Sequence, residues 1–235
     1  MDPQVQKNNL AIPIAIVIAG ALIAGAVFYT NGSASTAGAN QLEPQAPTGD
    51  LEAMAAVSAS DHVRGNPDAP VKIVEYSDTE CPFCKRFHET LIQVVDSNSD
   101  VAWIYRHFPL DQLHPKARKE AVATECANEL GGNDAFWKYL DRLFAITPAN
   151  NGLDPAELPK IAQYVGLDVA KFNECIGSTR YDQKIEDEVQ NAIATGGNGT
   201  PWSIVVSKNG TKYPLSGAQP LEAVKQLIDV ALKDN

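Results

Sequence analysis

Basic residues are scarce in this sequence. Its 235 residues include 19 lysines and arginines against 29 aspartates and glutamates, which gives a formal net charge of -10. Nucleic-acid-binding proteins present a basic surface to phosphate groups. The charge balance therefore predicts no nucleic-acid partner, and an acidic surface is more typical of a domain that is kept soluble by its charge.

Cysteine is also scarce, and its spacing excludes two common cofactor sites. The four cysteines are Cys81, Cys84, Cys126 and Cys175. No second C-x-x-C and no spaced histidine pair follows that could complete a zinc site with the first two cysteines and His88. Lys85 stands where covalent haem attachment requires histidine. We therefore expect neither a metal nor another cofactor at this motif. The even number of cysteines suits an oxidising compartment but allows three pairings.

Only one stretch is long and apolar enough for a membrane helix. Residues 10–28 carry no charge and would span about 28 Å as a helix, close to the thickness of a bilayer core. They predict an N-terminal membrane anchor within residues 1–30, although small residues at 33–37 leave a cleaved signal sequence as the alternative. Lys7 precedes the run and acidic residues follow it, which places the C-terminal part on the extracytoplasmic side.

The composition changes after this run. Residues 31–60 are rich in glycine, alanine, serine, threonine, glutamine and proline and lack sustained periodicity, so they predict a flexible linker. Residues 71–76 then alternate as a strand, residues 84–97 repeat apolar side chains at helical spacing, and residues 101–105 predict a second strand. This order predicts a right-handed parallel β-α-β unit.

The second half of the chain predicts a helical insertion followed by more sheet. About residues 112–197 carry only amphipathic helical patterns. Residues 202–206 and 212–215 then form a hairpin around Asn209-Gly210, and Pro214 places its second strand at an edge. A last helix starts near Pro220. The expected fold class is α/β, with a β-α-β unit, an all-helical insertion and a β-β-α unit.

The dithiol Cys81-Pro82-Phe83-Cys84 is the centre of the predicted chemistry. It lies between the first strand and the first helix, so Cys81 occupies a helix N-terminus. Free backbone amides and the helix dipole stabilise a thiolate there and lower its pKa. A purely structural disulfide is the alternative, but so short a loop would constrain the unfolded chain little.

Four motifs together carry a resemblance to a known family. They are Gly65 to Val71, Glu75 to Asp78 ahead of the dithiol, Tyr105 to Leu110 with His114-Pro115, and Gly199-Thr200-Pro201. In their order and types they resemble the DsbA-like thiol:disulfide oxidoreductases of the thioredoxin superfamily, over about residues 61–235. The resemblance implies a thioredoxin fold with an inserted helical subdomain.

The same resemblance assigns catalytic roles. It makes Cys81 the nucleophile, Cys84 the buried resolving cysteine and Glu75 a buried acid beneath the dithiol that exchanges a proton with Cys84. Strand alternation by itself would equally well turn Glu75 outward. Among substrate-binding residues, it implies a cis-proline at Pro201 and backbone contacts from Thr200.

Phe83 stands between the two cysteines on this substrate-binding surface. The family's strongest oxidants carry histidine between the cysteines. Phe83 offers the thiolate neither a cation nor a hydrogen bond, so we expect a milder oxidant, within the range of about -120 to -270 mV that bounds related enzymes.

The remaining implications concern the second cysteine pair and the partners. Some relatives have a disulfide in the helical insertion, which implies a bond between Cys126 and Cys175; two free buried thiols are the alternative. The expected activity is the introduction of disulfides into secreted or cell-envelope proteins. A membrane partner of the DsbB or vitamin K epoxide reductase type would reoxidise the enzyme. A disulfide reductase or isomerase, and a non-catalytic peptide-binding chaperone, remain as alternatives.

Overall fold

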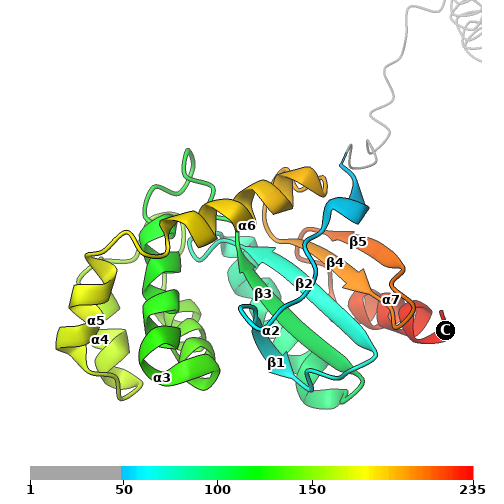
Figure 1. Cartoon of the computed structure of the whole chain (residues 1–235), viewed down its shortest axis with the longest axis horizontal. Helices are drawn as coiled ribbons and strands as arrows, with labels where there is room; N and C mark the ends of the chain where they lie inside the picture. The colour runs from blue at the N-terminus through cyan, green and yellow to red at the C-terminus, as the bar shows by residue number, and fades with distance from the viewer. Residues whose placement is uncertain (1–48, 235) are drawn as a thin grey trace, which may run out of the picture. The chain divides into compact units, whose positions relative to one another are not determined.

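A five-stranded sheet with helices on both faces forms the centre of the folded domain (Figure 1). The computed structural model describes residues 49–234. The strand order is β1-β3-β2-β4-β5. Strands β2 and β3 are parallel. Strand β1 is antiparallel to β3, β4 is antiparallel to β2, and β5 is antiparallel to β4.

The parallel unit confirms the sequence prediction. Strand β2 (Val71–Ser77), helix α2 (Pro82–Ser97) and strand β3 (Val101–His107) follow one another as expected. Strand β4 (Trp202–Val206) pairs with β2, and β5 (Lys212–Ser216) lies at the edge of the sheet. Pro214 has no amide hydrogen to donate, which an edge strand tolerates because one of its sides has no neighbouring strand.

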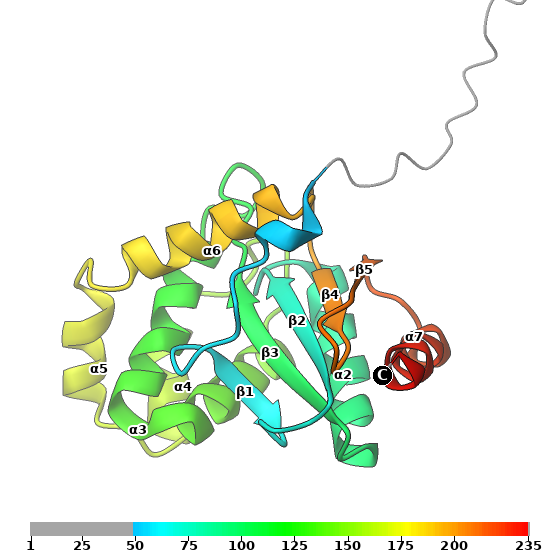
Figure 2. The same cartoon turned by 45° about the vertical axis from the view of Figure 1, so that its right-hand side comes forward.

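Helix α7 (Leu221–Lys233) completes the fold and packs with α2 on one face of the sheet. Helix α6 (Asp182–Ala194) covers the opposite face (Figure 2). Its Val189 and Ala192 belong to the same buried cluster as Val74 and Ile104 of the sheet. Both faces of the central strands are therefore buried. This explains why β2 and β3 read as nearly continuous apolar runs.

One strand was not predicted. Residues His62–Gly65 form β1, which pairs antiparallel with β3. Four residues are too few to establish a period-two pattern, so its position depends on pairing with β3. Just before it, Asn191 of α6 donates to the carbonyl of Ala53 and accepts from the amide of Ala55. This end of the predicted linker is thus hydrogen-bonded to the domain.

The insertion is entirely helical in the structure, as predicted. It contains α3 (Ala117–Ile146), α4 (Glu157–Tyr164) and α5 (Val169–Ile176), and it continues into α6. Helices α3, α4 and α5 gather beside the sheet (Figures 1 and 2). Gly132 interrupts α3 with a φ of 72°, a conformation that glycine adopts without steric cost.

Helix α3 contributes to two hydrophobic cores. Phe136, Trp137 and Leu140 face the core between the sheet, α2 and α7. Tyr139 and Leu143 belong to the separate core of the helical subdomain. The subdomain therefore packs directly on the domain that carries the dithiol.

The predicted membrane anchor lies outside the described residues. Within residues 49–234, no helix combines the length and apolar character that crossing a bilayer requires. The anchor, or signal sequence, at residues 10–28 stays a prediction from the sequence.

Candidate active site

The dithiol lies where β2 ends and α2 begins. Cys81 is the N-cap of α2, in an extended conformation, and Pro82 occupies the first helical turn, where its lack of an amide hydrogen costs nothing. The carbonyl of Cys81 accepts from the amide of Lys85 at 3.0 Å, which starts the helix. The thiol of Cys81 therefore lies at the positive end of the helix dipole, and both active-site cysteines are free thiols.

The two thiols differ strongly in acidity. A hydrogen bond from the Cys84 thiol, together with the amides of Phe83 and Cys84, lowers the pKa of Cys81 to about 6, although partial burial opposes the shift. Complete burial raises the pKa of Cys84 well above its ordinary value. At neutral pH the pair therefore holds one proton, and the negative charge resides on Cys81.

Glu75 lies buried in β2 and is wholly inaccessible to solvent. The hydroxyl of Ser77 donates to Oε1 at 2.8 Å, and Nε1 of Trp103 donates to Oε2 at 2.9 Å. Burial raises the pKa of Glu75 to about 8 despite both hydrogen bonds. Charge on Glu75 in turn raises the pKa of Cys84. The inward orientation that alternation left open is thus the one that the structure shows.

Thr200 and Pro201 face the dithiol from the other side of the site. The peptide bond between them is cis, and β4 begins immediately after it. Sγ of Cys81 lies 3.4 Å from the carbonyl oxygen of Thr200, to which it donates a hydrogen bond only when it is protonated. The segment leading into β4 therefore contacts the more acidic sulfur directly.

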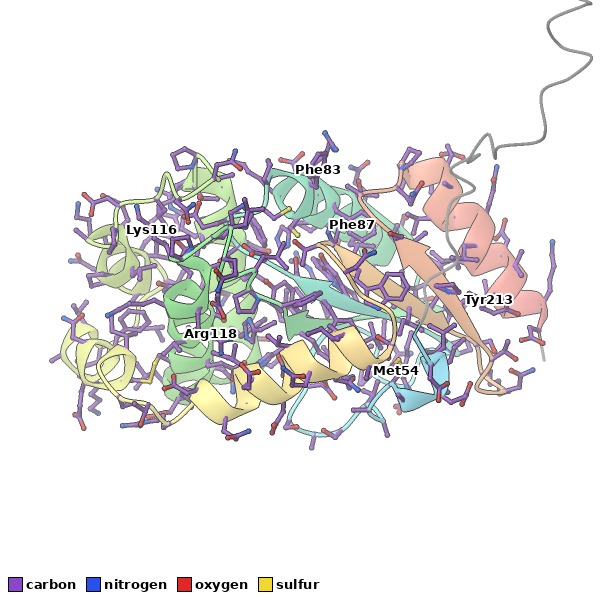
Figure 3. The ribbon with its side chains drawn as sticks, turned by 90° about the horizontal axis from the view of Figure 1, so that it is seen from above. Met54, Phe83, Phe87, Lys116, Arg118 and Tyr213 are labelled. Carbon is purple, nitrogen blue, oxygen red and sulfur yellow. A yellow bond between two sulfur atoms is a disulfide. The ribbon has the colours of Figure 1, made fainter. Side chains whose placement is uncertain are left out.

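Phe83 is the exposed residue of the motif. Its side chain is 53% exposed and points away from the sheet, whereas Phe87, one helical turn later, is fully buried (Figure 3). The guanidinium of Arg86 lies 5.1 Å from the Phe83 ring centroid. An aromatic ring thus stands in solvent beside Cys81, where it can contact another molecule.

Asp78 is a structural part of the site to which the sequence assigned no role. Its carboxylate accepts from the amides of Glu80 and Leu110, each at 2.8 Å, and pairs with Nδ1 of His114 at 2.9 Å. The amide of Asp78 donates to Sγ of Cys84 at 3.4 Å. Asp78 and His114 both belong to the sequence motifs that resemble the DsbA-like family, and this was the only feature of the sequence that pointed to them.

Glu80 was also missed, and it connects the dithiol to the loop after α3. Its carboxylate accepts from the amides of Gly152 and Leu153, and its carbonyl accepts from the amide of Asn150 at 2.7 Å. Lys116 donates to the carbonyls of Asn151 and Leu153 in the same loop, each at 2.7 Å. This loop contains three consecutive residues with positive φ, at 149–151, a conformation that costs free energy outside glycine.

The second cysteine pair forms the implied disulfide. Cys126 in α3 and Cys175 in α5 are bonded, with their Cα atoms 5.8 Å apart. Both lie in the core of the helical subdomain, away from the helix that carries Cys81. The predicted Cys126–Cys175 bond is thus confirmed, and it lies in a different part of the domain from the Cys81–Cys84 pair.

Comparisons with known proteins agree with this geometry. A family model described as thioredoxin matches residues 58–230. The crystal structure of Pseudomonas aeruginosa DsbA2 is 31% identical, covers 76% of this chain and 98% of its own, and superposes with a TM-score of 0.67. Oxidised BdbD from Bacillus subtilis is 22% identical, covers 79% of this chain and 96% of its own with a TM-score of 0.63, and supports the fold alone.

Curated relatives match over only part of their length. The Na(+)/H(+) antiporter NhaA 1 of Salinispora arenicola is 33% identical over 171 residues, which are 73% of this chain and 24% of that protein. NhaA 1 of Mycolicibacterium gilvum is 32% identical over 212 residues, 88% of this chain and 33% of that protein. This chain thus spans about a quarter to a third of these relatives. The match to the thioredoxin family model and to DsbA2, on a fold with this dithiol, shows that the chain belongs to the thioredoxin family and is a DsbA-like thiol:disulfide oxidoreductase.

Proposed function

We propose that the chain oxidises cysteine pairs in extracytoplasmic proteins. The observation that carries this proposal is the unequal acidity of the two thiols: the pKa of Cys81 is about 6, whereas that of buried Cys84 is raised. A thiol with such a pKa is about 90% thiolate at pH 7, which stabilises the reduced enzyme. A stabilised reduced state makes the corresponding disulfide a better oxidant.

The reaction is thiol-disulfide exchange. A substrate thiolate attacks Sγ of Cys81, a bond forms between the two sulfurs, and the Cys81–Cys84 bond breaks with its electron pair on Cys84. Glu75, mostly protonated at neutral pH because burial raises its pKa to about 8, supplies the proton that Cys84 takes up. The second substrate thiolate attacks the substrate sulfur of the mixed disulfide and releases Cys81 as thiolate. Two electrons pass to the enzyme.

The surface around Cys81 supports binding of an extended polypeptide. The carbonyl of Thr200, next to the cis bond to Pro201, lies within 3.4 Å of Sγ of Cys81 and offers an acceptor to a substrate amide. Phe83 adds exposed apolar surface on the other side of the sulfur. We propose Phe83, Thr200 and Pro201 as the substrate-binding residues.

An oxidase needs an electron acceptor, and we propose a membrane protein of the DsbB or vitamin K epoxide reductase type. The charge-free run at residues 10–28 would anchor the domain on the extracytoplasmic side of the membrane. The Cys126–Cys175 disulfide suits an oxidising compartment. The partial matches to proteins named as Na(+)/H(+) antiporters, which are membrane proteins, support the same location.

A disulfide reductase or isomerase is the second candidate, and Phe83 favours it. The ring supplies no hydrogen bond to the Cys81 thiolate, so the thiolate is less stabilised than a neighbouring histidine would make it. A less stabilised thiolate corresponds to a weaker oxidant.

The test compares two cysteine variants. The oxidised protein should refold reduced ribonuclease. Cys81→Ser and Cys84→Ser should both abolish this activity, because neither variant can form the Cys81–Cys84 disulfide. When it is offered a substrate that already contains disulfides, reduced Cys84→Ser should accumulate a mixed disulfide at Cys81, because Cys84 is no longer present to resolve it. Retained activity in Cys81→Ser refutes the mechanism. Alkylation of the protein in intact cells decides the direction of electron flow: a dithiol found mostly oxidised supports the oxidase, and a mostly reduced dithiol supports the reductase or isomerase.

A further inference from the structure

A buried cluster of polar side chains lies apart from the dithiol, at the junction of the sheet and the helical subdomain. It consists of His62 at the start of β1, His107 at the end of β3 and Glu125 in α3, each at most 3% exposed, with Lys184 of α6 beside them. Nε2 of His62 and Nε2 of His107 lie 2.7 and 2.9 Å from Oε1 of Glu125. The three potential ligand atoms all lie within 4.8 Å of one another.

The hydrogen bonds of this cluster cannot all be satisfied. Nζ of Lys184 lies 2.5 Å from Oε1 of Glu125 and 3.0 Å from Nε2 of His62. A neutral imidazole nitrogen carries either one proton or one lone pair. Nε2 of His62 can therefore donate to Glu125 or accept from Lys184, but not both. The remaining short contact joins two donors or two acceptors.

We propose that His62, His107 and Glu125 bind a divalent transition-metal ion such as Zn²⁺, and that Lys184 is the resident cation that the metal displaces. Two imidazoles and one carboxylate form a ligand set that zinc accepts, with water completing a tetrahedron. At zinc–ligand distances near 2.1 Å, tetrahedral ligand atoms lie about 3.4 Å apart. To reach this separation, Oε1 of Glu125 need move only about 0.7 Å away from Nε2 of His62 and about 0.5 Å away from Nε2 of His107. With a metal bound, both imidazoles present lone pairs, which removes the conflict.

The side chain of Lys184 has an alternative position when a metal ion displaces it from Glu125. Its side chain is 24% exposed, and Oε1 of Glu188 lies 3.5 Å from its Nζ as an alternative partner one turn along α6. Lys184 also lines an open cavity of about 360 Å³, together with Asp61, Asp187 and Glu188. Arg106 lines the same cavity and pairs with Asp61, so Asp187 and Glu188 are the carboxylates beside which the displaced ammonium of Lys184 would lie.

Two features hold the ligands in place. The His62 ring stacks on Phe136, with centroids 3.6 Å apart and planes 11° from parallel. The backbone amide of His107 donates to the carboxylate of Glu188 at 2.7 Å. The ligands come from β1, β3 and α3, so a bound metal would link the sheet to the helical subdomain. A ligand that binds only the folded state stabilises it.

The experiment titrates Co²⁺ and then Zn²⁺ into the full-length protein in mild detergent. Cys81→Ser/Cys84→Ser is used as the background, because thiolates also bind these metals. We expect one equivalent to bind, with a Co²⁺ spectrum of nitrogen and oxygen ligands and no thiolate charge-transfer band. Glu125→Gln should weaken binding by at least about tenfold.

Lys184→Met separates a metal site from a simple ion pair. Removing the competing ammonium should tighten metal binding by about tenfold or more and increase the metal-dependent rise in Tm. The reason is that the metal ion no longer has to displace a positive charge from Glu125. Lys160→Met, which removes an exposed lysine paired with Glu157, is the matched control and should change nothing. The proposal is overturned if the background protein binds no metal, if Lys184→Met leaves the affinity unchanged or weaker, or if Glu125→Gln binds as tightly as its parent.

Discussion

Glu75→Gln should make the reduced protein more stable at neutral pH. Buried Glu75 has a pKa of about 8 in the folded protein against an ordinary value of 4.5. Between these values the folded state holds a proton that the unfolded state has released. Stability therefore falls as the pH rises through this window, by about 1.4 kcal/mol per pH unit.

The magnitude follows from this linkage. At pH 7 the wild-type residue costs about 3 kcal/mol relative to pH 4.5, and above pH 8 the cost reaches about 5 kcal/mol. Glutamine does not titrate, so it adds no pH dependence to the free energy of unfolding. Its amide can preserve both hydrogen bonds, because Oε1 can accept from Trp103 while Nε2 donates to the hydroxyl of Ser77. The variant should thus gain about 3 kcal/mol at pH 7 and almost nothing at pH 4.5.

Urea denaturation of the reduced proteins at pH 4.5, 7 and 8.5 measures the difference. Glu89→Gln, which removes an exposed carboxylate of α2, is the matched control and should track the wild type at each pH. A Glu75→Gln variant that is less stable at pH 7, or whose advantage does not grow with pH, would refute the assigned protonation of Glu75.

The same substitution should slow the chemistry. Without the carboxyl group, Cys84 loses the proposed partner for its proton. We expect dithiothreitol to reduce the oxidised variant more slowly than the wild type. The pair of results, a gain in stability with a loss in rate, would show that Glu75 is retained for function at a cost in stability.

Three further predictions concern the cysteines and Phe83. Alkylation of Cys81 in the reduced protein should follow a pH midpoint near 6, and a midpoint near 9 would contradict its environment. Replacing both Cys126 and Cys175 by alanine should lower the free energy of unfolding by up to about 4 kcal/mol, because the bond closes a loop of about 50 residues; equal stability in urea would contradict this. Phe83→Ser should raise the KM for an unfolded protein substrate on the order of tenfold, as expected for losing part of an aromatic contact. Tyr164→Ser, at another exposed aromatic, should leave KM unchanged.

The sequence predicted the elements whose signal is local. The strand at 202–206 was found to the residue, and α2 ends at Ser97 as expected, because alternation and helical spacing are properties of neighbouring residues. Glu75 could not be oriented this way. Strand β2 is buried on both faces, so alternation carries no information about the direction of its side chains.

The features that were missed depend on distant segments. Strand β1 is defined by its pairing with β3, and the contacts of Glu80 lie about 70 residues away in the loop after α3. The cluster of His62, His107 and Glu125 joins three elements without any sequence motif. Such sites arise only when the topology brings their parts together, and no spacing rule describes them.

Helix α3 has a consequence for how this domain can be altered. One side of it, with Phe136 and Leu140, belongs to the core under the sheet, and another side, with Tyr139 and Leu143, belongs to the core that the disulfide crosses. The helical subdomain is therefore not a removable module. Deleting it would expose the apolar side chains of the catalytic half that Phe136 and Leu140 now cover. Even the short loop between α4 and α5 packs Val165 and Leu167 against the second core, so lengthening it would disturb that core.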